Sequence, residues 1–405
     1  MEKKVVELFA GVGGFHLGFK KSGEKWDFTW ANQWEPSRKS QYAFDCYKKH
    51  FGEETICSNE DIAIVDVKDI PNHSVLVGGF PCQDYSVAST GAKGIQGKKG
   101  VLWWEIYRIL KSKQPPFVLL ENVDRLLKSP ASQRGRDFGV MLSCFAELGY
   151  SVEWRVINAA EYGFPQRRRR IFIFAYRNDT VYGKSLAECA PQDIINNRGF
   201  FVSQFDVIKD ENNSLTEAEL DFNNIEEVSN NFSFKFFNTG IMRDGNIYTV
   251  KTVPNYNGRK QLLKDIIIDS VEDKYFIDGE EEDKFKEMKG SKRIKRISKT
   301  GHEYIFSEGA MSLTDDLNKP GRTMLTSEGT KNRSTHLIEV KKSDNDIKLR
   351  KLTPIECERL NGFDDDWTNT GMTERFRYFC MGNALVVGLV TKMSIELSDI
   401  IDKEK

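Results

Sequence analysis

Residues 5–15 read Val-Val-Glu-Leu-Phe-Ala-Gly-Val-Gly-Gly-Phe, an apolar run that passes directly into a glycine-rich turn. Such a run is typical of a buried strand, and Gly11 and Gly13 permit a tight turn at which the main chain can approach a ligand closely. Similar short runs rich in Val, Ile, Leu and Phe occur at 74–78, 117–121 and 171–175. Because helical patterns separate these runs, we predict an α/β fold with a doubly wound, mostly parallel sheet.

The composition changes along the chain. After about residue 180, Asn, Asp, Ser, Lys and Glu become frequent and the apolar periodicity weakens. Thr353-Pro-Ile-Glu then begins a helix, with Thr353 as N-cap and Glu356 completing a capping box. We therefore predict a cofactor-binding domain formed by 1–180 and 365–405, and a smaller, irregular domain formed by 181–364.

Length and composition are those of an ordinary soluble protein. The 405 residues are 39% hydrophobic and 29% charged, without the run of about 18 apolar residues that a membrane span needs. The amino terminus lacks the pattern of a secretory signal, so we expect a cytoplasmic protein without membrane contact. Seven scattered cysteines without a Cys-x-x-Cys pair indicate free thiols, with neither a disulfide framework nor a metal site.

The net charge of −1 is not that of a general nucleic-acid binder. A DNA-binding surface would need a local concentration of positive charge, and two segments offer one. Arg167–Arg170 is the first, and Lys284–Lys299, with eight basic residues against the single acid Glu287, is the second. The alternative for each segment is a solvated face.

The glycine turn at residues 9–15 is suited to a nucleotide-like cofactor, although a plain strand-to-helix connection would look similar. Such a cofactor needs a hydrogen-bond partner for its ribose at the end of the next strand, roughly twenty residues further on. Gln33, Trp34 and Glu35 lie at that offset. This pattern fits NAD as well as S-adenosylmethionine.

A cysteine follows another of the predicted strands. In Val77-Gly-Gly-Phe-Pro-Cys-Gln, Cys82 comes just after the carboxyl end of the strand, where open α/β sheets bind ligands. A free cysteine is more often part of the core, but here two glycines and a proline form a rigid turn that would present the thiol. The polar, glycine-containing stretch up to Gly100 is typical of a loop that closes over a substrate.

Two further strands carry charged residues at their ends. Glu121 follows an apolar strand and could transfer protons, or it could equally cap the next helix. Arg168 and Arg170 enter the strand at 171–175, and alternate residues of a strand share a face. We therefore expect both guanidinium groups to point toward a phosphate or a polar base edge, with a solvated basic patch as the alternative.

Together these motifs resemble the bacterial cytosine-5 DNA methyltransferase family, over roughly residues 1–178 and 350–390. The resemblance rests on six motifs in the family's order: Phe9-Ala-Gly-Val-Gly-Gly, Phe80-Pro-Cys-Gln, Glu121-Asn-Val, Gln166-x-Arg-x-Arg, Arg350-x-Leu-Thr-Pro-x-Glu-x-x-Arg-Leu-x-Gly-Phe and Gly382-Asn. It implies a Rossmann-like, S-adenosylmethionine-dependent methyltransferase fold with an inserted target-recognition domain at 181–364.

The resemblance also implies a mechanism. The thiolate of Cys82 adds to C6 of a cytosine flipped out of double-stranded DNA, and C5 then accepts the methyl group of S-adenosylmethionine. Glu121 holds and protonates cytosine N3, while Arg168 and Arg170 fix the base and balance charge. A monomer is expected, with a restriction endonuclease of the same specificity as a possible partner.

For the cofactor, the resemblance implies contacts by the following residues: Phe9, Gly11, Gly13, Gln33, Trp34, Glu35, Asp61, Ile62, Leu102 and Asn383. The family usually has an acid where Gln33 stands, arginine at Lys99 and leucine at Met324. Because a carboxylate accepts hydrogen bonds from ribose hydroxyls more strongly than an amide does, we favour Glu35 over Gln33 as the ribose partner.

Three other functions were considered. A transfer RNA cytosine methyltransferase would share these motifs, but the long 181–364 segment favours a DNA reader. A non-catalytic DNA-binding protein would not need Cys82 and Glu121 together. An NAD oxidoreductase would explain neither Cys82 nor the arginines before residue 171.

Overall fold

The computed structural model describes residues 1–36, 38–80, 102–209, 214–221, 223–297, 301, 303–343 and 346–404. They form two compact units, and each is considered by itself. Unit 1 comprises residues 1–163, 169–259 and 386–405, and unit 2 comprises residues 164–168 and 260–385.

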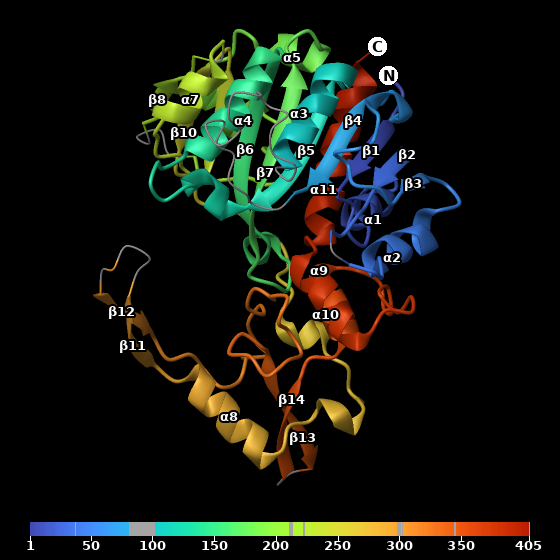
Figure 1. Cartoon of the computed structure of the whole chain (residues 1–405), viewed down its shortest axis with the longest axis vertical. Helices are drawn as coiled ribbons and strands as arrows, with labels where there is room; N and C mark the ends of the chain where they lie inside the picture. The colour runs from blue at the N-terminus through green and yellow to red at the C-terminus, as the bar shows by residue number, and fades with distance from the viewer. Residues whose placement is uncertain are drawn as a thin grey trace. The chain divides into compact units, whose positions relative to one another are not determined.

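Unit 1 is built on a ten-stranded sheet in the order β3-β2-β1-β4-β5-β7-β6-β9-β10-β8 (Figure 1). Its strands are β1 (Lys4–Leu8), β2 (Asp27–Asn32), β3 (Ile56–Ser58), β4 (Val75–Gly79), β5 (Phe117–Val123), β6 (Tyr150–Asn158), β7 (Arg169–Arg177), β8 (Thr216–Glu219), β9 (Thr239–Arg243) and β10 (Asn246–Val250). Strands β1 to β5 pair in parallel, whereas β7 is antiparallel to both β5 and β6. The strand order reverses between β1 and β4, the point at which open α/β sheets bind ligands.

Helices cover both faces of this sheet (Figure 1). The helices of unit 1 are α1 (Gly14–Lys21), α2 (Tyr42–Phe51), α3 (Leu102–Lys113), α4 (Arg136–Glu147), α5 (Val181–Leu186), α6 (Pro191–Asp193), α7 (Ile225–Asn231) and α11 (Val387–Lys403). The apolar faces of α3 and α4 join one side of the sheet in a continuous buried cluster that includes Val6, Leu76 and Ile173. On the other side, α1 packs on α11 and α5 packs on β7.

The predicted strands at 5–9, 74–78, 117–121 and 171–175 correspond to β1, β4, β5 and β7, so the predicted fold class is confirmed. The last helix, α11, begins at Val387, because α10 ends at Asn383 and an extended segment separates the two helices.

The structural division of the chain differs from the predicted domains. Residues 181–259 belong to unit 1, because α5 packs on β7 and because β9 pairs with β6 and extends the sheet. Residues 365–385 belong instead to unit 2. The buried residues of the sheet extension, such as Phe200, Phe236 and Met242, are scattered in sequence, so they give no periodic signal.

Unit 2 contains two separate two-stranded sheets and three helices among the residues that the structure describes. Its elements are α8 (Gly279–Lys289), β11 (Lys292–Ile297), β12 (Glu303–Glu308), β13 (Leu337–Ser343), β14 (Asp346–Lys351), α9 (Pro354–Asn361) and α10 (Glu374–Asn383). Helix α9 has the predicted Thr353 cap and capping box with Glu356.

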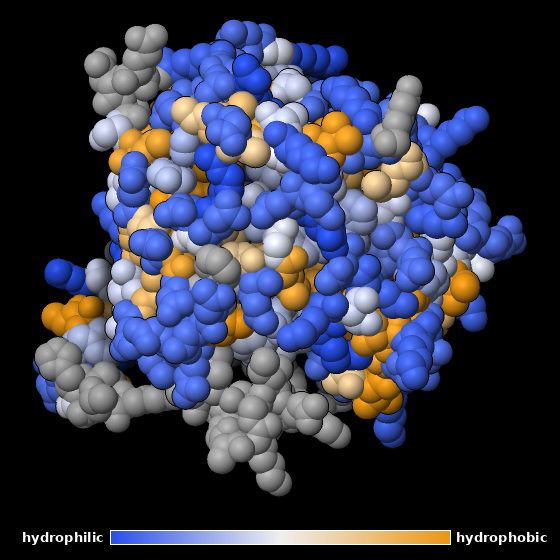
Figure 2. All heavy atoms as spheres, turned by 90° about the horizontal axis from the view of Figure 1, so that it is seen from above, coloured by the Kyte–Doolittle hydropathy of each residue, from blue (hydrophilic) through white to orange (hydrophobic). Residues whose placement is uncertain are grey.

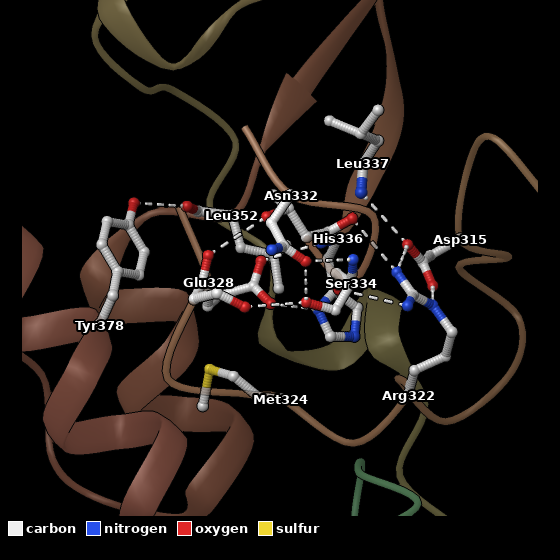
Figure 3. Close-up of polar contacts among 12 residues, drawn as sticks. Asp315, Arg322, Met324, Glu328, Asn332, Ser334, His336, Leu337, Leu352 and Tyr378 are labelled. Atoms are coloured by element: carbon white, nitrogen blue, oxygen red, sulfur yellow. Dashed lines mark hydrogen bonds and ion pairs between the residues drawn. The ribbon is translucent and has the colours of Figure 1, made fainter. Parts of the chain in front are cut away.

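Buried polar groups hold the middle of unit 2 together (Figure 3). The Glu328 carboxylate accepts a hydrogen bond from the main-chain N–H of His336 and lies 2.9 Å from its Nδ1. Asp315 accepts two bonds from Arg322 and one from the N–H of Leu337. Buried polar groups need such partners, and here the partners fix the segment that leads into β13.

The surface is predominantly hydrophilic, as the high content of charged residues leads one to expect. On the face seen in Figure 2, hydrophilic side chains predominate and apolar ones form small, separate patches. Within the described ranges, no helix has the length and apolar character required to cross a bilayer.

Candidate active site

The glycine turn after β1 has the backbone conformation that its sequence requires. Phe9, Gly11 and Gly13 have φ angles of 55°, 56° and 88°. A side chain at Gly13 would place its Cβ 2.5 Å from Cε2 of Phe51, whereas nothing lies within 4 Å of a Cβ at Gly11. Gly13 is thus required by conformation and packing, and Gly11 leaves space beside the turn. A non-glycine residue in the left-handed region, as Phe9 is, is found disproportionately at functional sites.

Three buried polar side chains form a hydrogen-bonded series beside this turn. Glu7 in β1 is fully buried, which raises the pKa of its carboxyl group to about 8. Tyr47 of α2 donates to Glu7 Oε2 at 3.1 Å, and His16 Nδ1 lies 2.9 Å from the Tyr47 hydroxyl. The His16 ring is stacked between Phe28 and Phe51, and burial lowers its pKa to about 3. The sequence analysis missed this series, whose one local signal is a glutamate inside an apolar strand.

The predicted ribose partners lie just after β2. The side-chain oxygen of Gln33 accepts a hydrogen bond from the N–H of Gly11 at 2.7 Å, so Gln33 contacts the glycine turn. Trp34 is 37% exposed. Burial raises the pKa of Glu35, while the N–H of Ala43, at the start of α2, donates to its carboxylate. Of the two candidates, Gln33 is therefore the one that reaches the turn, although chemistry alone favoured Glu35.

The other predicted cofactor residues of unit 1 lie after β3 and at the start of α3. Asp61 Oδ1 accepts from the N–H of Ala63 at 3.0 Å, and the carbonyl of the buried Ile62 accepts from Arg108 at 2.8 Å. Leu102 begins α3 and packs against the main hydrophobic cluster. The contacts of Asp61 and Ile62 fix the main chain where cofactor contacts were expected.

Cys82 and Lys99 lie outside the described residues, which resume at residue 102. The described chain before that gap ends at Phe80, directly after β4. The carbonyl of Phe80 accepts a hydrogen bond from the Asn122 side chain at 2.8 Å. This bond joins the carboxyl ends of β4 and β5.

Glu121 lies next to the end of β4. It pairs with Gly79 in the sheet register, and a Cβ at Gly79 would lie 3.1 Å from Glu121 Oε2. Arg170 of β7 forms an ion pair with Glu121, with 2.8 Å between Nε and Oε1, and both side chains are largely buried. The next short helix has Val123 as its N-cap residue, so Glu121 is not a helix cap.

Arg168 differs from what we predicted. It belongs to unit 2, is 1% exposed, and donates to the carbonyl groups of Met324 at 3.0 Å and Gly382 at 2.9 Å. Arg170 belongs to unit 1, where it contacts Glu121. The two arginines fall in different units, because β7 begins at Arg169 and Arg168 lies before the strand.

The element Arg322-Thr-Met is anchored within unit 2 by the motif at Gln166. The N–H of Met324 donates to Gln166 Oε1 at 3.1 Å, and the Met324 carbonyl is held by Arg168. Asn383 is the last residue of α10 and is exposed. Gly382 before it packs closely, because an added Cβ would lie 2.4 Å from the N atom of Thr326.

No group of three or more His, Cys, Asp and Glu side chains suited to a metal ion occurs among the described residues. The sheet order and the glycine turn after β1 are those of an open, doubly wound α/β fold, which binds ligands at the carboxyl ends of its strands. Comparison with known proteins identifies its family. The model of the C-5 cytosine-specific DNA methylase family matches residues 3–398, so the chain belongs to this family and is a DNA cytosine-5 methyltransferase.

Relatives and solved structures agree with this assignment. The Type II methyltransferase M.Sau3AI of Staphylococcus aureus is 54% identical over 402 residues, which are 98% of this chain and 96% of the relative. The Type II methyltransferase M.SsoII of Shigella sonnei is 27% identical over 98% of this chain and 81% of its own length. The crystal structure of the S. pombe Dnmt2 methyltransferase matches with a TM-score of 0.60 at 14% identity, covering 99% of each chain, and so shows the fold alone.

Proposed function

We propose that this enzyme methylates C5 of a flipped-out cytosine within a specific duplex DNA site, with Cys82 as nucleophile. The observation that carries the proposal is the Glu121–Arg170 ion pair beside Gly79, three residues before Cys82. An acid held at this position can contact a base that Cys82 attacks. A transfer RNA methyltransferase is not favoured, because the family model and the relatives described above are DNA methyltransferases.

In the proposed mechanism the Cys82 thiolate forms a bond to C6 of cytosine. The electron pair of the C5–C6 double bond moves to form a C4–C5 double bond, and that of the C4–N3 double bond moves onto N3. Glu121, in its protonated form, donates a proton to N3. Arg170 keeps Glu121 in place and balances the negative charge. C5 then has enamine character and can accept a methyl group. A base from solvent then removes the C5 proton, and its electron pair re-forms the C5–C6 double bond as the C6–S bond breaks and frees Cys82. N3 returns its proton to Glu121, which restores the aromatic ring.

Other cysteines are poorly suited to this role. Burial raises the pKa of the Cys144 and Cys357 thiols well above the ordinary value, and it also raises that of Cys57. Because the thiolate is the nucleophilic form, a raised pKa makes these side chains unreactive. Cys82 is the cysteine that follows the carboxyl end of a central strand.

We further propose that S-adenosylmethionine is the cofactor, which supplies an electrophilic methyl group when bound. The features that support this are the space beside Gly11, the exposed Trp34 ring and the left-handed Phe9. The residues proposed to hold it are Phe9, Gly11, Gly13, Gln33, Trp34, Glu35, Asp61, Ile62, Leu102 and Asn383. Gln33 is the favoured ribose partner because its side chain contacts the glycine turn.

By analogy with the Type II relatives, we propose that the enzyme acts as a cytoplasmic monomer in restriction-modification, alongside an endonuclease with the same target. Bisulfite sequencing of DNA from a methylation-deficient host that expresses the chain tests the activity and identifies the target. We expect protected cytosines at one short sequence with the wild type and none with Cys82→Ser. Full conversion of every cytosine with a well-expressed wild type would overturn the proposal.

A further inference from the structure

The hairpin formed by β11 and β12 lies almost entirely in solvent. It follows α8 in unit 2 and, within that unit, extends away from β13 and β14 (Figure 1). Ile297 and Ile305 are 69% and 60% exposed, although both are large apolar residues. A two-stranded hairpin with both faces in water is at best marginally stable. These features indicate a surface that a partner covers.

The positive charge of the predicted basic segment is divided between two elements. The α8 lysines are largely neutralised: Lys286 pairs with Glu282 at 2.8 Å, and Lys289 is 1% exposed and donates to a carbonyl. In contrast, Arg293 and Lys295 of β11 are exposed. The structure therefore assigns any DNA contact of this segment to the hairpin rather than to the helix.

The register of the hairpin separates its two faces. Arg293, Lys295 and Ile297 share one face, together with Ile305, which pairs with Lys295. On the opposite face, the guanidinium group of Arg296 lies 4.0 Å from the centre of the Phe306 ring, a cation–π contact that occupies both side chains. The first face thus presents two cations, two exposed isoleucines and the exposed acid Glu303, which pairs with Ile297.

We propose that this face of the β11–β12 hairpin enters the major groove of duplex DNA. The inference rests on the proposed function, in which DNA is the substrate. It identifies the hairpin as an element that binds this DNA. The major groove is about 12 Å wide and admits a two-stranded ribbon. Arg293 and Lys295 contact phosphates, while Ile297 and Ile305 pack against base edges, including thymine methyl groups. Arg293 and Lys295 outnumber Glu303 on this face, so its net positive charge suits an anionic partner.

The test compares the salt dependence of DNA affinity among three proteins: wild type, Arg293→Ala/Lys295→Ala, and Lys341→Ala/Lys348→Ala. The last variant is a matched control that removes two exposed lysines from the other hairpin of unit 2. Fluorescence anisotropy gives Kd for one labelled duplex between 50 and 200 mM salt. Each phosphate contact contributes about −0.9 to the slope of log affinity against log salt, so the hairpin variant should have a slope smaller by about 1.8. Over this range the wild type should lose about tenfold more affinity than the variant.

A variant that lacks the two isoleucines distinguishes insertion into the groove from electrostatic attraction to phosphates. Ile297→Ser/Ile305→Ser should weaken binding several-fold at every salt concentration and leave the slope unchanged. An unchanged slope in Arg293→Ala/Lys295→Ala, or a slope equally reduced in the control, would overturn the inference. Sedimentation of wild type and variants without DNA should give the same mass. A wild-type dimer that dissociates in the hairpin variants would mean that a second copy covers this face.

The bisulfite assay keeps this inference distinguishable from the proposed function. If the wild type methylates DNA and the slopes are equal, the hairpin inference alone fails. If the wild type binds DNA with the predicted slopes but methylates none, the proposed chemistry fails and the hairpin inference stands.

Discussion

Glu7 gives the enzyme a pH-dependent stability that a single substitution should remove. Its carboxyl group is fully buried, and burial raises its pKa from the ordinary 4.5 to about 8. Between pH 6.5 and 8 the folded state therefore keeps the proton and the unfolded state does not, so stability is lost as the pH rises. One unit of pKa difference corresponds to about 1.4 kcal/mol, which gives a loss of about 2 kcal/mol over this interval.

Below pH 6.5 a second group opposes the first. Burial lowers the pKa of His16 to about 3, so between pH 6.5 and 4.5 the unfolded state gains a proton there that the folded state does not. Acidification therefore favours unfolding through His16 while it favours folding through Glu7. The interval from pH 6.5 to 8 is the one in which the Glu7 effect is not offset by His16.

The measurement is urea unfolding of wild type and Glu7→Gln at pH 6.5, 7.2 and 8. Tryptophan fluorescence reports chiefly on unit 1, since Trp367 is the one tryptophan of seven in unit 2. Glutamine resembles the neutral acid, so the variant should lose about 2 kcal/mol less stability than wild type across the interval. Glu53→Gln, at an exposed position, should behave as wild type, and the buried Glu153 titrates alike in all three proteins. Parallel pH profiles of wild type and Glu7→Gln would refute the reasoning.

Three further predictions concern the site. Arg168→Ala removes two charged hydrogen bonds to buried carbonyl groups and should destabilise unit 2 by about 3–5 kcal/mol. Hydrogen exchange at residues 322–326 should become faster, and Arg168→Lys should give an exchange rate between those of wild type and Arg168→Ala. Unchanged exchange with lost methylation would instead mean that Arg168 acts on DNA. Gln33→Ala should weaken S-adenosylmethionine binding about tenfold in calorimetry, and Glu35→Ala should weaken it less. A larger loss of affinity in Glu35→Ala would mean that Glu35, and not Gln33, binds the ribose. Gly13→Ala should lower the unfolding free energy by about 2–5 kcal/mol, because of its positive φ and the contact with Phe51, and a stable variant would contradict both arguments.

Local sequence patterns predicted the elements that carry their own signal. Strands β1, β4, β5 and β7 appear as short apolar runs, and the Thr353–Glu356 capping box marks the start of α9. The acid at Glu121 was found because it ends such a strand, and the structure adds its ion pair with Arg170. These features depend on residues that are neighbours in sequence.

Features that depend on distant residues were not predicted. The hydrogen-bonded series from Glu7 to His16 requires Tyr47, which lies 40 residues from Glu7, so no local pattern shows it. The boundary of unit 1 depends on the pairing of β9 with β6. The sequence around β9 has weak apolar periodicity, so it does not predict this pairing. The role of Arg168 depends on hydrogen bonds to the carbonyl groups of Met324 and Gly382, which lie more than 150 residues away in the sequence.

The central claim, that Cys82 bonds to the target base, can be tested by trapping. A duplex with 5-fluorocytosine at the target cytosine allows addition and methyl transfer, but fluorine cannot leave C5 as a cation, so elimination stops. With S-adenosylmethionine, the wild type should give a complex that survives a denaturing gel, and the modified peptide should contain Cys82. Cys82→Ser should give none. A wild type that methylates the unmodified duplex but forms no stable complex, or one that is trapped through another cysteine, would contradict the account.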